Sequence, residues 1–212
     1  MRSPLFMLPA ALLAAVMCGC ADSGNGTSTT GPSPPGSPRL SGMLSDPAGD
    51  VVATAQVPNP PDVIAATIDV ANQTLSLIVT FVPGTLAPQT GFRVHLDTDE
   101  NAATGTPTFT GEGNNTIGAD YAVTGFNPHD PSRAALQRNI TGGAPSFLGT
   151  LDVVIEANVR RLSIPLAQLG GDDGRLQFKL DCYQVIASSG TTQTIAQGDL
   201  IPNFGLPAGL VR

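Results

Sequence analysis

The chain has 212 residues, with 17 acidic and 10 basic side chains, a formal net charge of −7 and no tryptophan. Binding to nucleic acid requires clustered basic residues that neutralise phosphates, so this charge balance argues against nucleic acid as a partner. The acidity is compatible with divalent cations, and it is also common in exported proteins that stay soluble.

The N-terminus has the pattern of an export signal. Arg2 is followed by an apolar run over residues 5–16 and then by small residues around two cysteines. The run is shorter than the roughly 20 apolar residues that a membrane-spanning helix needs. We therefore expect a cleaved signal peptide over residues 1–19 and not a membrane span.

The segment Met17-Cys18-Gly19-Cys20 resembles a lipobox, the processing motif of bacterial lipoproteins. The resemblance implies that Cys20 carries a lipid, which anchors the protein to a membrane at the cell envelope, on the periplasmic face or the cell surface. Cys20 fits the motif better than Cys18, because Gly19 precedes Cys20 whereas the bulkier Met17 precedes Cys18. The alternative is an ordinary secretory peptide with unrelated cysteines.

Residues 20–40 are rich in Ser, Gly, Thr and Pro and show no apolar periodicity. Such a segment buries too little surface to offset the entropy lost on ordering, so we expect a flexible, disordered tether. One folded domain is then expected over residues 41–212.

Short apolar alternations between Gly, Pro, Asn and Asp predict an all-β domain, namely a two-sheet antiparallel β-sandwich of the immunoglobulin-like or jelly-roll-like kind. The expected strands are residues 63–70, 75–81, 92–96, 120–123, 134–138, 151–157, 161–164 and 176–185, with a last strand that includes residues 192–196. The turn at residues 71–74 predicts a hairpin, and Pro165 and Gly170 predict one helical turn.

Two cysteines remain after the signal peptide is removed, and a lipidated Cys20 cannot form a disulfide with Cys182. In its expected strand, Cys182 shares one face with Phe178 and Leu180, because side chains alternate at period two. We interpret Cys182 as a buried structural thiol and not as a nucleophile.

The most informative stretch is residues 95–105, where a strand ends in an acidic loop. Asp97, Asp99 and Asn101 place oxygen ligands at alternate positions, as in the first half of an EF-hand loop. Thr108 stands where an EF-hand has its final Glu, and no flanking helices are predicted, so an EF-hand is rejected. We predict a calcium ion at these three residues, completed by Asp120.

Further acidic residues are weaker metal candidates. Glu112 precedes Asp120 in the chain, and Asp46 and Asp50 form a second acidic corner. Asp and Asn also end strands and cap turns through their own hydrogen bonds to the backbone, which is the alternative to metal binding.

Several short motifs follow one another along the domain: residues 46–50 (DPAGD), 61–64 (PDVI), 96–101 (LDTDEN), 118–121 (GADY) and 164–166 (IPL). Their order and spacing resemble the DOMON and carbohydrate-binding-module-9-like group of secreted bacterial β-sandwiches. The resemblance implies two antiparallel sheets, often with calcium, and ligands that vary among sugars, haem and protein surfaces.

Two departures limit this resemblance. Sugar-binding members hold sugar rings between aromatic side chains, whereas this chain has no Trp and only two tyrosines, Tyr121 and Tyr183. Haem-binding members use Met and His as axial ligands, and here Met43 is the only methionine after the signal peptide, with His95 or His129 as its partner.

No catalytic residue is predicted, because the two histidines are in no recognisable catalytic arrangement. His95 alternates with Arg93 and is expected to point to solvent. We therefore expect a non-catalytic, calcium-stabilised binding or structural module whose partner is a glycan or an envelope protein. The alternatives are a haem-binding electron-transfer domain and an envelope hydrolase.

Overall fold

The computed structural model describes residues 39–51, 53–108, 116–125, 130–189, 192–202 and 206–212. The signal peptide, Cys20, most of the tether, Glu112 and His129 lie outside these residues, so their predicted roles stay predictions. Among the described residues, no helix is long and apolar enough to cross a membrane.

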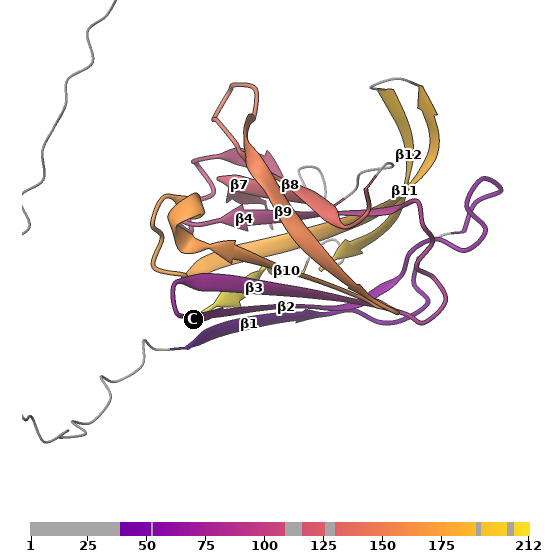
Figure 1. The fold of residues 1–212 in the computed structure, drawn as a ribbon, viewed down its shortest axis with the longest axis horizontal. Coiled ribbons are helices and arrows are strands. Elements are labelled where there is room, and N and C mark those ends of the chain that lie inside the picture. The colour runs from indigo at the N-terminus through magenta and orange to yellow at the C-terminus, as the bar shows by residue number, and fades with distance from the viewer. Residues whose placement is uncertain (1–38, 52, 109–115, 126–129, 190–191, 203–205) are drawn as a thin grey trace, which may run out of the picture. The chain divides into compact units, whose positions relative to one another are not determined.

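The described residues form two layers of antiparallel strands. One layer consists of β1 (Leu40–Ser45), β2 (Val63–Ala71), β3 (Thr74–Phe81) and β10 (Val159–Pro165). The other consists of β8 (Arg133–Arg138), β7 (Tyr121–Gly125), β4 (Thr90–Asp97), β11 (Leu176–Ser189) and β12 (Thr192–Ile201). Figure 1 shows β1, β2 and β3 side by side, with β4, β7 and β8 in the layer above them in that view.

Strand β9 (Ser146–Glu156) belongs to both layers. Its first half pairs with β8, where Leu151 lies opposite Ala134, and its second half pairs with β10, where Val153 lies opposite Leu162. In Figure 1 it crosses obliquely between the layers. The long β9 therefore turns one hydrogen-bonded sheet into the two faces of a sandwich.

The C-terminal strand β13 (Gly209–Val211) joins the layers a second time. It pairs with β11, and the neighbouring Arg212 exchanges two backbone hydrogen bonds with Ser41 of β1, at 3.3 and 3.4 Å. The predicted all-β antiparallel sandwich is confirmed, and its two layers are linked on both sides.

The core lies between the inward faces of the two layers. On β3 the alternate residues Leu75, Leu77, Val79 and Phe81 are at most 1% exposed. On β11 the alternate residues Phe178, Leu180 and Cys182 are fully buried, which confirms the predicted burial of the thiol. The alternation at period two thus directs one face of each strand into the core.

The predicted hairpin and helical turn are also confirmed. Strands β2 and β3 pair up to Ala71 and Thr74, and the two residues between them, Asn72 and Gln73, have φ of 51° and 60°. Two successive positive φ values are typical of a type I′ hairpin turn. The helical turn is a 3-10 helix over Leu166–Leu169 that ends at Gly170 in the left-handed conformation.

Four strands were not predicted: β1, β13, β5 (Thr106–Thr108) and β6 (Ile117–Ala119). Three of them have only three residues, which is too short to show an alternation. β5 and β6 form a hairpin, and β6 lies against β4 and β11. This small second sheet adds a third layer over part of the outer face.

The prediction that His95 points to solvent was wrong, because its exposed fraction is only 9%. His95 lies on the outer face of β4, opposite Lys179 of β11, which is 3% exposed. Thr108 of β5 lines the same pocket as His95. The β5–β6 hairpin was missed from the sequence, so the cover over His95 was missed too.

Candidate metal centre

Asp97 is the innermost residue of the predicted calcium site. It ends β4, where it pairs with Gln177 of β11, and its exposed fraction is 1%. Its Oδ1 accepts a hydrogen bond from the backbone N–H of Asn101 at 3.1 Å, and its Oδ2 accepts one from Gly118 at 3.2 Å. The strand end and the β5–β6 hairpin therefore hold this carboxylate in one orientation.

The loop after Asp97 folds back on itself. Oδ1 of Asp99 accepts a hydrogen bond from the N–H of Asn101 at 3.0 Å, and both its oxygens lie 2.9 Å from the Thr104 hydroxyl. Glu100 has a φ of 52°, which turns the backbone sharply between these residues. The loop thereby brings the Asp99 carboxylate next to that of Asp97.

Asp120 reaches the same place from another segment. It precedes β7, and its N–H donates a hydrogen bond to the carbonyl of Leu96 at 2.8 Å. Its Oδ2 accepts hydrogen bonds from the N–H and the hydroxyl of Thr98, at 3.0 and 2.9 Å. The pairing of β4 with β7 thus places Asp120 beside the acidic loop.

One carboxylate oxygen from each of Asp97, Asp99 and Asp120 lies within 4.8 Å of the other two. Two oxygens that each bind a Ca²⁺ ion at about 2.4 Å can be at most about 4.8 Å apart, so the spacing fits shared coordination. The three predicted carboxylates therefore converge in the folded chain.

Asn101, the third predicted ligand of the loop, takes part in the hydrogen bonds that shape it. The residue is exposed, and its side-chain Oδ1 accepts a hydrogen bond from the N–H of Ala103 at 3.1 Å, which forms an Asx turn. Its backbone N–H binds the carboxylates of Asp97 and Asp99. Asn101 thus organises the loop through its backbone.

The electrostatics of the site follow from its burial. Burial raises the pKa of Asp97 to about 6, and the carboxylates of Asp99 and Asp120 act in the same direction. The backbone hydrogen bonds from Asn101 and Gly118 act in the opposite direction. A bound cation would favour the ionised carboxylate that burial disfavours.

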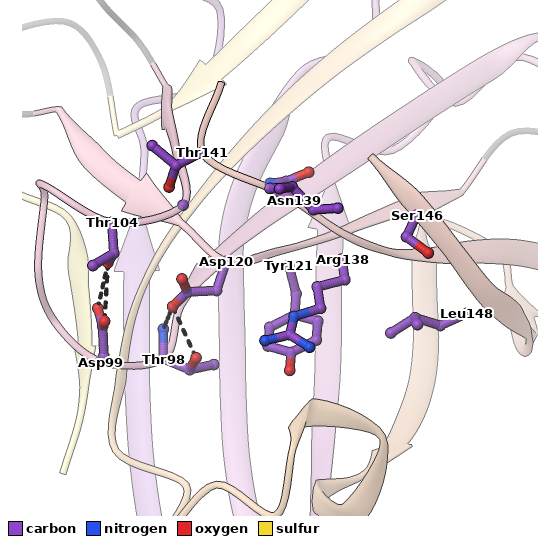
Figure 2. A pocket seen from close by; sticks show the side chains of 12 residues that line it. Thr98, Asp99, Thr104, Asp120, Tyr121, Arg138, Asn139, Thr141, Ser146 and Leu148 are labelled. Carbon is purple, nitrogen blue, oxygen red and sulfur yellow. Dashed lines mark hydrogen bonds between the residues drawn. The ribbon is translucent and has the colours of Figure 1, made fainter. Parts of the chain in front are cut away.

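An open pocket of about 670 Å³ lies next to these carboxylates. Figure 2 shows Asp99 and Thr104 on one side of the pocket, Ser146 and Leu148 on the other, and Asp120 between them. Arg138 and Asn139, at the end of β8, contribute a guanidinium and an amide to its lining. The pocket therefore has a mixed lining of polar and apolar groups, with Asp99 and Asp120 in its wall.

The weaker candidates Asp46 and Asp50 are also brought together, and a third carboxylate, Asp199 of β12, joins them within 4.8 Å. Sequence reasoning missed Asp199. The available signal was a charged residue near the end of the last long strand, directly before the apolar Leu200 and Ile201.

The residues considered for haem and for catalysis occupy different environments. Met43 is 66% exposed on β1, whereas His95 is buried, and its Nε2 lies 2.9 Å from Oδ1 of Asp181. The His95–Asp181 pair lines a pocket of about 270 Å³ together with Arg93 and Tyr183. Thr108 contributes the hydroxyl of a threonine to the lining of the same pocket.

A scan against protein-family models and a search among curated proteins found no match for this chain.

Proposed function

We propose that the protein is an envelope lipoprotein, held to a membrane through Cys20, whose β-sandwich is a non-catalytic binding or structural module stabilised by calcium. The convergence of Asp97, Asp99 and Asp120 is the observation that supports the calcium ion. In this proposal the DOMON and carbohydrate-binding-module-9-like resemblance describes the domain, and the ion stabilises its loops without taking part in a reaction.

Calcium would act mainly as a cross-link between two segments of the chain. Asp97 and Asp99 belong to the end of β4 and its following loop, whereas Asp120 follows β6. An ion shared by all three carboxylates joins the loop to the start of β7 and offsets the repulsion among three negative charges, of which Asp97 is buried, Asp120 half-buried and Asp99 exposed. Water and backbone carbonyls complete the six to eight oxygen ligands that Ca²⁺ takes.

The neighbouring pocket is the proposed ligand surface for a glycan or an envelope protein. Its hydroxyl, amide and guanidinium groups, from Ser146, Asn139 and Arg138, form the kind of polar lining that binds hydroxyl-rich or charged ligands. Because Asp99 and Asp120 also line it, occupation of the metal site would order one wall of the pocket.

A calcium titration of the purified full-length protein in detergent tests the metal site. After chelator treatment, calorimetry and amide NMR are expected to detect Ca²⁺ binding, with shifts at the Asn101 and Gly118 amides that bond to Asp97. The Asp97→Asn variant is expected to lose this response, and the exposed Asp152→Asn serves as the matched control. Unchanged Asn101 and Gly118 signals in the wild type would exclude calcium from this site.

Anchoring is tested separately by substitution of the expected lipidation site. The Cys20→Ala protein should leave the membrane fraction, and mass spectrometry should show that the lipid is lost. A product that is still membrane-bound and unchanged in mass, apart from the substitution, would contradict the lipoprotein assignment.

A further inference from the structure

A second group of carboxylates lies where the connection between β1 and β2 meets β12. Asp46 follows β1 directly, and Asp50 is four residues further along the same turn. Asp199 comes from β12, and one oxygen of each of these residues lies within 4.8 Å of the other two. The group therefore combines a local turn with a strand from the far end of the chain.

A fourth carboxylate, Asp62, lies against the same turn from the residue that precedes β2. Its Oδ2 accepts a hydrogen bond of 2.8 Å from the N–H of Gly49, which is located between Asp46 and Asp50. Asp62 is only 4% exposed, and its Oδ1 is buried with no hydrogen-bond partner among the described residues. A buried carboxylate oxygen without a partner is costly, so this oxygen calls for a ligand.

Two hydrogen bonds hold the Asp199 carboxylate in place, and its oxygens can still bind a cation. It lies opposite Cys182 of β11, faces the core and is 5% exposed. Its Oδ2 accepts a hydrogen bond from the N–H of Val63, and its Oδ1 accepts one from Leu200, both at 2.8 Å. An ionised carboxylate has about four acceptor positions, so both oxygens remain able to bind a cation.

Among the described residues, no basic side chain balances the charge of the two most buried carboxylates near this turn. Within the described residues, no ion pair joins Asp62 or Asp199 to Lys, Arg or His. Burial raises the pKa of Asp199 to about 7, and burial raises that of Asp46 to about 6, with neighbouring carboxylates adding to both. Burying several negative charges together is unfavourable unless a cation accompanies them.

We propose a second binding site for a divalent cation, Ca²⁺, formed by the carboxylates of Asp46, Asp50 and Asp199, with the buried carboxylate of Asp62 beside the same turn. The donors are all oxygens, which favours a hard cation over a transition metal. Ca²⁺ fits better than Mg²⁺, because Mg²⁺ is usually bound through one or two carboxylates and several waters, whereas three carboxylates converge here.

The second ion has a different structural role from the one proposed at Asp97. It ties the connection between β1 and β2 to β12, which lie at opposite ends of the hydrogen-bonded strand order. Because it shares no residue with the site at Asp97, each site is able to exist without the other.

The test is a calcium titration of the full-length protein and of variants at each site, followed by calorimetry. The wild type is expected to bind two Ca²⁺ ions, and Asp199→Asn and Asp62→Asn are each expected to weaken one of them at least about tenfold. Asp97→Asn should weaken the other one, and Asp152→Asn neither. Wild-type stoichiometry and affinity in both Asp199→Asn and Asp62→Asn would overturn the second site while leaving the first untouched.

Amide NMR of the wild type gives a readout that does not depend on the folding of any variant. Addition of Ca²⁺ to the chelator-treated protein should shift the Gly49, Val63 and Leu200 amides, which bond to Asp62 and Asp199. The Asn101 and Gly118 amides report on the first site. Saturation that moves only the Asn101 and Gly118 signals would overturn the second site.

Discussion

Without a bound cation, the wild-type protein is expected to lose stability as the pH rises from about 4 to about 8. In the Asp199→Asn variant this loss of stability should be smaller. In the folded chain, burial raises the pKa of Asp199 to about 7, from its usual 3.8. Between these values the folded state keeps a proton that the unfolded state has lost, so unfolding releases a proton. The stabilisation is therefore complete below pH 3.8 and disappears as the pH rises through about 7.

The size of the effect follows from the difference between the two pKa values. Each pKa unit corresponds to about 1.4 kcal/mol, so Asp199 alone accounts for about 4 kcal/mol. For a domain of this size, 1 kcal/mol changes the Tm by about 2–4 °C, which makes the expected loss about 8–16 °C. Asn cannot titrate, so the variant lacks this part of the pH dependence.

Thermal unfolding of both proteins in chelator, at several pH values, measures the difference directly. The wild-type Tm should fall relative to the Asp199→Asn Tm as the pH rises, and saturating Ca²⁺ should remove the fall, because the cation favours the ionised carboxylate. Parallel Tm curves for the two proteins in chelator would show that Asp199 is not titrating in this range and would refute the reasoning.

Three further predictions concern the first metal site and the core. In Gly118→Ala the new Cβ would lie 2.3 Å from the Thr104 carbonyl oxygen, so the acidic loop must shift. Calorimetry should show that the affinity for Ca²⁺ is lowered about tenfold or more. An unchanged affinity would contradict the close packing. Phe178→Ala removes a fully buried ring and should cost about 3–5 kcal/mol in urea unfolding, whereas a loss below about 1 kcal/mol would contradict its core position. Burial raises the pKa of the Cys182 thiol. Mass spectrometry should therefore find that an alkylating reagent at pH 8 modifies this thiol in urea but not in the folded protein. Rapid modification of the folded protein would be inconsistent with the burial of Cys182.

The sequence by itself determined much of the sandwich and part of its first acidic site. The alternation of Leu75, Leu77 and Val79 predicts β3 and the face that it buries, because side-chain direction in a strand depends only on position along the chain. The same local rule predicts the burial of Cys182. Asp97 and Asp99 are two residues apart where a strand passes into a loop, so their proximity was also readable from the sequence.

Only the tertiary structure decided which distant residues meet. Asp199 reaches Asp46 because β12 pairs with β11 in a register that points Asp199 into the core, and Asp62 reaches the same turn through Gly49. His95 is buried through its position near a hairpin whose strands, three residues each, show no period in the sequence. Strand alternation is a local property of the chain, whereas register and layer contact depend on the packing of the whole domain, and these decide where charge is buried.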